Sequence, residues 1–342
     1  NSIYTHKEIF LREIISNASD ACDKLCYQAL TDSAVGMDRG DFKIEITADK
    51  DARTLTVSDN GIGMDRADLE NNLGIIASSG SYKFKQELGD DAGETDVIGQ
   101  FGVGFYSAFM VSDQITVVTR KHGSETGYKW QSSGADGYTI SECEKETVGT
   151  DIVMHIKPDT DDEKYSEFLE NWRLQELVRK YSDYIRFPIR MEVSKTRKKE
   201  DSPEDKPEYE TYTEVETLNS MVPIWQRAKS EVTQDEYFKF YRDKFHDYAD
   251  PQRVIPVSVE GSVTYKALLF VPGAAPFDYY TKDFEKGLQL YSNGVLIMDK
   301  CADLLPEHFR FVRGVVDSPD LSLNISRELL QHDRQLKVIA GN

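Results

Sequence analysis

Three motifs in the amino-terminal third of the chain constrain its fold more than any other feature. They are Glu13-x-x-x-Asn17-x-x-Asp20, then Asp59-Asn-Gly61-Ile-Gly63, then Gly99-Gln-Phe-Gly102-Val-Gly104-Phe105. The spacing of the first motif puts its polar side chains on one face of a helix. The second offers backbone that a flat ligand can approach, and the third is a glycine-rich loop whose N–H groups can bind phosphates. Together the three motifs predict a nucleotide site.

The residue types suggest a role for each position in such a site. Asn17 offers a neutral oxygen that suits Mg²⁺, and Glu13, one helical turn earlier, can orient or deprotonate a water. An ionised Asp59 only accepts hydrogen bonds, so the exocyclic amine of adenine is its natural partner. We expect Gly61 and Gly63 to leave room for the ring, and Met64 to lie against it.

Each motif also has a structural interpretation. The helix stripe of Glu13, Asn17, Asp20 and Lys24 could be a solvated face with an Asp20–Lys24 ion pair. Asp59-Asn-Gly61 could be a tight turn, and the later glycines could serve helix packing. The glycine-rich loop lacks the Gly-Lys-Ser/Thr ending of a P-loop. Only the combination of the motifs makes the nucleotide interpretation strong.

Length and charge limit the remaining possibilities. A chain of 342 residues favours two domains. A formal net charge of −19 argues against nucleic acid and anionic membranes as partners. No apolar run is long enough to span a bilayer, and there is no signal-peptide pattern at the start. Asn1-Ser2-Ile3-Tyr4 resembles the interior of a domain, so we expect a fragment of a longer protein.

The four cysteines do not form a metal-binding pattern. Cys22 and Cys26 have helical i, i+4 spacing, but no second pair of matching ligands accompanies Cys22, Cys26, Cys143 and Cys301. A structural role is therefore favoured over a metal site. Reduced cysteines in an acidic chain are typical of the cytoplasm.

Periodicity predicts alternating helices and strands along the chain. The expected helices are Lys7–Leu30, Met64–Leu73, Phe105–Val111, Lys164–Ile185 and Thr233–Tyr248. The expected strands are Phe42–Ile46, Thr54–Val57, Gln114–Arg120, Gly127–Ser132, Gly137–Cys143, Thr150–His155, Val254–Glu260, Lys266–Val271 and Gly287–Ile297. Residues 74–99 are too long for a simple connection and suggest a lid. The charged run from Lys195 to Glu208 suggests a linker or an exposed hairpin tip.

These motifs resemble those of the ninety-kilodalton heat-shock chaperones. The similarity extends over nearly the whole chain, and beyond the charged run it includes Pro276-Phe277-Asp278 and Leu321-Ser-Leu-Asn324-Ile-Ser-Arg327-Glu-Leu-Leu-Gln331. The short charged run favours the bacterial branch of the family. The resemblance implies an α+β fold in which a two-layer α/β sandwich of the Bergerat type binds ATP. Its mixed sheet would carry helices on one face, and an α/β middle domain would follow. The implied boundaries are 1–194 for the ATP domain with a lid at about 74–100, 195–210 for the linker, and 211–342 for a truncated middle domain.

The resemblance also implies roles for individual residues. Glu13 resembles the general base, and Arg327 resembles a middle-domain arginine that reaches the γ-phosphate when the domains close. Asn17 resembles the magnesium ligand and Asp59 the adenine reader, with Thr150 near the adenine. The other implied nucleotide-binding positions are Asp20, Gly63, Met64, Asn72, Gly102, Val103, Gly104, Phe105 and Gln331. Asn324 and Gln331 would support the arginine loop.

Two positions depart from the family pattern. Ile75 replaces a hydroxyl residue and Ser78 replaces a lysine, so nucleotide affinity or lid closure is expected to differ. From the resemblance we also expect the family's exchanged first strand and carboxyl-terminal dimerisation domain to lie outside this sequence. We therefore expect this fragment to be monomeric and a weak ATPase, although its parent would be an active homodimer.

The leading interpretation is an ATP-dependent, magnesium-requiring chaperone that remodels client proteins. The surface around Trp225 is one candidate for client binding, with burial of Trp225 in the core as the alternative. A DNA-handling ATPase of the gyrase or mismatch-repair type is disfavoured by the acidic charge. A histidine kinase is disfavoured because none of the six histidines has the setting of a phosphoacceptor. A nucleotide-sensing scaffold that does not hydrolyse ATP remains open.

Overall fold

The computed structural model describes residues 6–74, 104–134, 137–198, 209–261, 263–276, 279–321 and 334–341. The chain divides into two compact units. The first unit, His6–Arg179 with Phe187–Asn219, contains an eight-stranded sheet, and the second unit, Lys180–Arg186 with Ser220–Asn342, contains a five-stranded sheet.

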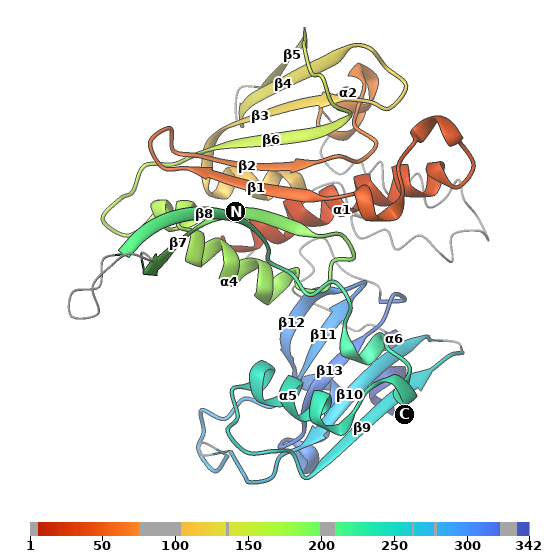
Figure 1. The fold of residues 1–342 in the computed structure, drawn as a ribbon. Helices are drawn as coiled ribbons and strands as arrows, with labels where there is room; N and C mark the ends of the chain where they lie inside the picture. The colour runs from red at the N-terminus through yellow and green to blue at the C-terminus, as the bar shows by residue number, and fades with distance from the viewer. Residues whose placement is uncertain are drawn as a thin grey trace. The chain divides into compact units, whose positions relative to one another are not determined.

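The sheet of the first unit has the strand order β5-β4-β3-β6-β2-β1-β7-β8 (Figure 1). Neighbouring strands are antiparallel except β1 and β7, which are parallel, so the sheet is mixed as expected. The strands are β1 Ile44–Asp49, β2 Thr54–Asp59, β3 Ser112–Arg120, β4 Gly127–Gly134, β5 Gly137–Cys143, β6 Gly149–Ile156, β7 Ile189–Lys198 and β8 Tyr209–Thr217.

Helix α1 (Ile9–Ala29) covers one face of this sheet, beside the 3-10 helix η4 (Gly104–Met110). Burial alternates along β2 and β3, because every second side chain points toward this covered face. The remaining helical segments of the first unit are η1 Ser33–Val35, η2 Arg39–Asp41, α2 Arg66–Asn72, η5 Tyr165–Leu169 and α4 Asn171–Tyr181. The predicted α+β architecture, a mixed sheet with helices packed on it, is confirmed.

The helix predicted over Lys164–Ile185 is interrupted. Glu170 is extended (φ −88°, ψ 126°) and separates η5 from α4. The interruption lets η5 bury Phe168 against Phe10 of α1, with ring centroids 5.2 Å apart, while α4 buries Leu174 and Leu177. In one continuous helix, Phe168 would lie on a different side from Leu174 and Leu177, so these side chains could not all point into the core. The segment predicted as a helix from Phe105 is also 3-10 rather than α-helical.

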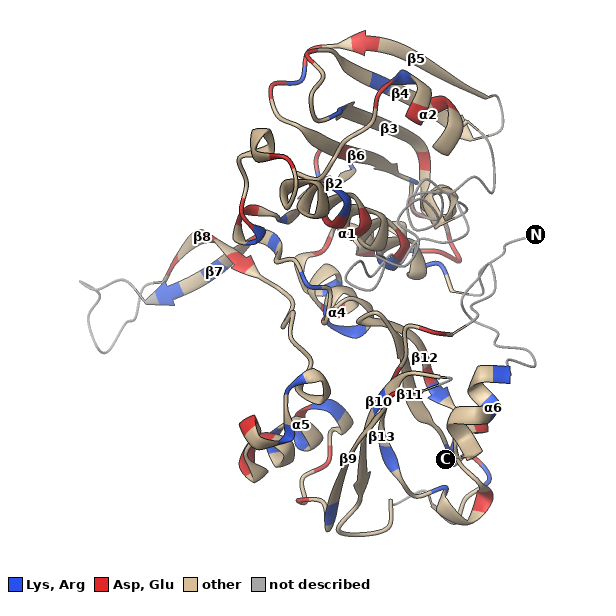
Figure 2. Cartoon of the chain, turned by 90° about the vertical axis from the view of Figure 1, so that its right-hand side faces the viewer, with Lys and Arg blue, Asp and Glu red and all other residues tan. Residues whose placement is uncertain are grey.

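The first four residues of the charged run, 195–198, belong to a strand of a hairpin. Lys195 pairs with Tyr212, and Arg197 with Glu210, so β7 and β8 form one antiparallel ladder. Basic residues of β7 and acidic residues of β8 lie on neighbouring strands (Figure 2). Their side chains form ion pairs, for example between Lys195 Nζ and Glu214 Oε1 at 2.9 Å. The hairpin alternative is therefore correct, and the boundary between the compact units falls after Asn219 rather than at 195–210. Residues 199–208 lie outside the described part of the chain.

The sheet of the second unit has the order β12-β11-β13-β10-β9, in which only β11 and β13 are parallel. Its strands are β9 Arg253–Val259, β10 Tyr265–Val271, β11 Leu288–Ser292, β12 Val295–Cys301 and β13 Arg313–Asp317. Its helices are η6 Ile224–Gln226, η7 Lys229–Glu231, α5 Gln234–Phe245, η8 Ala302–Leu304, η9 Glu307–Phe309 and α6 Arg334–Gly341. Thr233 and Glu236 form a capping box that begins α5.

In the second unit, one sequence-based expectation is wrong, and the structure decides between the two alternatives for Trp225. The strand predicted over Gly287–Ile297 is a hairpin, because Asn293 and Gly294 have positive φ angles of 50° and 77° and turn the chain. Trp225 is only 6% exposed, and its indole Nε1 donates to Asp317 Oδ2 at 3.0 Å. Its ring centroid lies 4.6 Å from that of Tyr184. Trp225 is therefore a core residue and not part of an exposed client surface.

Candidate functional site

The polar stripe on α1 is buried, which contradicts its interpretation as a solvated face. Glu13 and Asp20 are 3% and 1% exposed, and Asn17 between them is half-buried. Arg12 holds one oxygen of Glu13, with Nε and Nη2 lying 3.0 and 2.8 Å from Oε1. Because burying charged groups is costly, their placement on the packed side of a helix indicates a functional site.

The second oxygen of Glu13 lies beside the start of η4. A Cβ atom added to Gly104 would come within 2.5 Å of Glu13 Oε2, so a larger residue here would displace the Glu13 carboxylate. The structure thus brings the first motif together with the one described glycine of the third. Gly102 and Val103 lie outside the described residues.

Asp59 is the last residue of β2 and lies directly opposite Thr150 of β6. Its carboxylate accepts a hydrogen bond from the Gly61 N–H at 2.9 Å and another from the backbone of Thr150. Burial raises the pKa of Asp59 to about 7, although these two hydrogen bonds and the nearby Lys145 oppose the shift. The side chain is half-buried and retains lone pairs that a ligand could use.

The two glycines after Asp59 have a different role from the one expected. A Cβ atom on Gly61 would lie 2.4 Å from the backbone carbon of Ala21 in α1. A Cβ atom on Gly63, where φ is +67°, would lie 2.0 Å from the carbonyl oxygen of Arg120 at the end of β3. Protein backbone therefore lies directly against both glycines, at the positions where a side chain would project. The glycines instead let this segment pass between α1 and β3.

Thr119 links the strand ends to the segment that follows Asp59. It lies opposite Thr150, so Asp59, Thr150 and Thr119 are aligned across β2, β6 and β3. The two threonine hydroxyl oxygens are 2.9 Å apart, and Met64 N–H donates to Thr119 Oγ1 at 2.9 Å. The half-buried Met64 is thereby fixed near Asp59 and Thr150.

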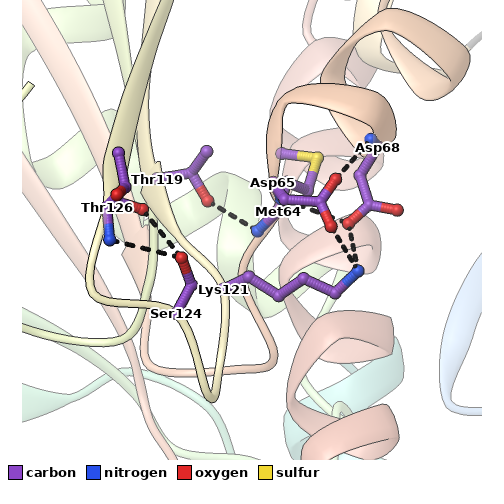
Figure 3. Close-up of polar contacts among 7 residues, drawn as sticks. All are labelled: Met64, Asp65, Asp68, Thr119, Lys121, Ser124 and Thr126. Atoms are coloured by element: carbon purple, nitrogen blue, oxygen red, sulfur yellow. Dashed lines mark hydrogen bonds and ion pairs between the residues drawn. The ribbon is translucent and has the colours of Figure 1, made fainter. Parts of the chain in front are cut away.

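Lys121 forms ion pairs with two aspartates that follow Met64 in the chain (Figure 3). Its Nζ lies 2.8 Å from Asp65 Oδ2 and 2.7 Å from Asp68 Oδ2. Asp65 and Asp68 also form the capping box that begins α2. Lys121 is not among the site residues predicted from the sequence. The Asp65-x-x-Asp68 pattern predicts a helix start, but not the distant cation that binds both carboxylates.

The end of α2 carries Asn72, which is half-buried. The next residue, Leu73, accepts a hydrogen bond through its carbonyl oxygen from the Tyr106 hydroxyl at 2.7 Å. Since Tyr106 belongs to η4, this bond joins the end of α2 to η4, which begins at Gly104. The expected contact of Asn72 with phosphate stays a prediction.

Lys24 completes the α1 stripe and interacts with three acidic groups. Burial lowers its pKa, while Asp20, Asp68 and Asp59 raise it. Because these carboxylates come from α1, α2 and β2, the structure brings their charges into one region. Asp20 is thus one of three carboxylates whose charge acts on Lys24.

Some expected site residues do not contribute side chains here, and others cannot be placed. The Phe105 ring is 5% exposed and packs edge-on against Trp130 at 5.4 Å, so it belongs to the core. Residues 75–103, which include Ile75, Ser78 and most of the expected lid, lie outside the described residues, as do Asn324, Arg327 and Gln331.

The described residues contain no preformed metal cage. No group of three His, Cys, Asp or Glu side chains converges among them. Cys22 is buried with Val35, Phe42 and Phe187, which supports the structural role of this cysteine. None of the described helices is both long and apolar enough to cross a membrane.

Comparison with known families agrees with this site. Residues 4–152 match the family described as histidine kinase-, DNA gyrase B-, and HSP90-like ATPase. Residues 167–211 and 199–342 match the Hsp90 protein family. This chain belongs to the Hsp90 family. The match to the Hsp90 protein family decides between a chaperone, a gyrase-type ATPase and a histidine kinase. The other match cannot do so, because its family includes all three.

Individual relatives give the same result. The chain is 61% identical over 340 residues to "Chaperone protein HtpG" of Clostridium acetobutylicum, covering 99% of this chain and 54% of the relative. It is 59% identical over 342 residues to the protein of the same name from Bacillus subtilis, covering 100% of this chain and 54% of that relative. This Hsp90-family chain therefore spans about half the length of the curated relatives it matches.

Proposed function

We propose that this chain is the nucleotide-binding part of an ATP-dependent molecular chaperone that hydrolyses ATP to remodel client proteins. One observation carries the proposal. The carboxylate of Asp59 lies at the end of β2, bound by two backbone groups, in the same unit in which Glu13 is held against Gly104. Membership of the Hsp90 family and the relatives named as chaperones support the same conclusion.

The nucleotide would be recognised at both ends. Asp59 would accept the adenine amine, with Thr150, Gly63 and Met64 nearby. Asp20 lies on the same α1 stripe as the catalytic groups. The phosphates would meet Asn72, Gly104 and the backbone of Phe105, together with Gly102 and Val103. This grouping is supported by the hydrogen bond from the Tyr106 hydroxyl of η4 to the carbonyl oxygen of Leu73, which directly follows α2.

Glu13 would act as the general base. Arg12 fixes one of its oxygens, which leaves Oε2 on the side of Gly104 to orient a water. Asn17 would be the protein ligand for Mg²⁺, and its half-buried amide fits an ion that keeps several waters and binds substrate phosphates. When bound, Mg²⁺ would neutralise phosphate charge.

Hydrolysis would depend on groups from both domains. We propose that residues around 74–100 form the lid, and that Arg327, supported by Asn324 and Gln331, contacts the γ-phosphate on closure. The whole protein would act as a cytoplasmic homodimer on client proteins. This chain by itself would be monomeric and weakly active.

Calorimetric titration with Mg·ADP tests the proposal, with Asp59→Asn as the matched variant. We expect the wild-type chain to bind and the variant to bind much more weakly while remaining folded. Glu13→Ala should then retain Mg·ADP binding and lose ATP turnover. A folded wild-type chain that binds no nucleotide would refute the proposal. Turnover that persists in Glu13→Ala would refute the role of Glu13 alone.

A further inference from the structure

The hydroxyl of Thr119 has three polar neighbours and no contact with solvent. It lies 2.9 Å from Met64 N, 3.1 Å from the carbonyl oxygen of Gly149 and 2.9 Å from Thr150 Oγ1. Thr119 is 0% exposed, so water cannot complete its hydrogen bonds. Figure 3 shows the bond from Met64.

Hydrogen-bond accounting fixes the direction of each bond. A hydroxyl group has one proton and two lone pairs. The N–H of Met64 can only donate, so it occupies one lone pair of Thr119, and the Gly149 carbonyl can only accept, so it takes the Thr119 proton. The second lone pair of Thr119 is then filled by the proton of Thr150. This arrangement uses the full capacity of a hydroxyl that has no access to water.

The direction of these bonds determines what Thr150 can offer to a ligand. Its proton is directed at Thr119, so only its lone pairs face other partners. Asp59, its direct neighbour across β2 and β6, also only accepts when it is ionised. Two adjacent acceptors fit an amino group, whereas a carbonyl oxygen at the same place would be repelled.

We propose that Thr119 is a specificity-determining positioning residue: it holds the Thr150 hydroxyl as an acceptor, so that Thr150 and Asp59 together select a 6-aminopurine nucleotide over a 6-oxopurine nucleotide. This inference rests on the proposed nucleotide-binding function. It goes beyond that function because Thr119 would act through the Thr150 hydroxyl and not through a contact of its own with the nucleotide. Nothing in the local sequence distinguishes Thr119 from Thr116, the other threonine of β3.

The experiment compares the dissociation constants of Mg·ADP and Mg·IDP, whose bases carry a 6-amino and a 6-oxo group. Calorimetry would be performed on the wild type, Thr119→Val and Thr119→Ser. Thr116→Val is the control, since Thr116 lies on the same strand but on the alternate face. In Thr119→Val, the Thr150 proton loses its acceptor and can turn toward a 6-oxo group. We expect the ADP-over-IDP preference to fall about tenfold. Thr119→Ser and Thr116→Val should retain the wild-type preference.

The outcomes separate this inference from the proposed function. A wild type that binds neither nucleotide would overturn both. If Thr119→Val weakened the binding of Mg·ADP and Mg·IDP equally, Thr119 would only stabilise the Met64 segment. The specificity role would then be wrong, but the proposed ATP site would be unaffected. Should Thr119→Val fail to fold, Thr119→Cys provides the second test, because a thiol is a poor acceptor for the Thr150 proton. An unchanged preference in a folded Thr119→Cys would likewise overturn the inference.

Discussion

Two aspartates, one in each unit, end a strand and yet have opposite surroundings. Asp317 ends β13, is 4% exposed, and accepts hydrogen bonds on Oδ2 from Trp225 Nε1 and Gln226 Nε2, each at 3.0 Å. Asp59 ends β2, is half-buried, and accepts from the backbone N–H groups of Gly61 and Thr150.

The difference separates a structural carboxylate from a functional one. Asp317 is held by side chains of its own core, so it joins η6 to the sheet. Asp59 is held by backbone N–H groups, and burial raises its pKa to about 7. Its ionised form is therefore less favourable in the folded chain than in the unfolded chain. Groups that cost stability in this way commonly serve binding or catalysis. Four predictions test the contrast.

The largest effect should come from Asp59→Ala. We expect the affinity for Mg·ADP to fall at least about 100-fold, because the adenine amine loses its charged acceptor. The melting temperature at pH 8 should stay the same or rise, since the variant removes a group that is unfavourable to ionise. Calorimetric titration and differential scanning calorimetry measure the two quantities. A clear loss of stability with unchanged affinity would make Asp59 structural and remove the contrast.

Asp317→Ala should show the reverse pattern. The free energy of unfolding of the second unit should fall by about 3 kcal/mol, because Trp225 and Gln226 each lose a buried acceptor. The dissociation constant for Mg·ADP should change less than about twofold, since the site lies in the first unit. Denaturant unfolding followed by calorimetric titration checks both. Weakened nucleotide binding in the folded variant would count against the separation of roles.

The third prediction concerns pH. The folded-state pKa of Asp59, about 7, lies above its ordinary value of 3.8. The contribution of this group to folding stability is therefore fully present below the ordinary value and is lost as pH rises through 7. Nucleotide binding should have the opposite dependence, because it needs the ionised carboxylate. From pH 8 to pH 6, the affinity for Mg·ADP should fall about tenfold.

Asp59→Asn is the control for this pH profile. Any pH dependence left in that variant belongs to the nucleotide or to other groups, so the difference between the two profiles reports Asp59. Parallel profiles for the wild type and a variant that still binds measurably would show that Asp59 does not titrate in this range.

The smallest effect should come from Lys121→Met. Its ion pairs with Asp65 and Asp68 are partly exposed, so they contribute about 0.5 kcal/mol each at most. We expect Mg·ADP affinity to fall about two- to threefold at low salt, and this difference to disappear near 1 M salt because exposed charges are screened. Lys50→Met, which removes a pair with Glu170 at the surface, is the matched control and should not change affinity.

Much of the site was predictable from local sequence. The spacing of Glu13, Asn17 and Asp20 fixes one helix face, and Asp59 after an alternating strand predicts a side chain at a strand end. The resemblance to the Hsp90 family and the mixed α+β fold, both expected from these motifs, are confirmed. These features depend on residues that lie within a few positions of each other, where helix and strand periodicity decide direction.

Other features depended on pairings that the sequence does not encode locally. The charged residues of β7 and β8 have the composition of a linker, and only their cross-strand partners make them a hairpin. Trp225 beside Pro223 has no local sign of burial, because Asp317 and Tyr291 that surround it come from distant strands. The apolar character of a residue gives its tendency to be buried, but not its partners.

The sequence by itself thus determined which side chains are available for nucleotide chemistry and which face of α1 carries them. Only the tertiary structure decided that Gly61 and Gly63 serve the passage of backbone between α1 and β3, and that Thr119, Thr150 and Asp59 share one line across three strands. The physical reason is that helix periodicity acts over one or two turns, whereas strand register joins residues through hydrogen bonds between distant segments.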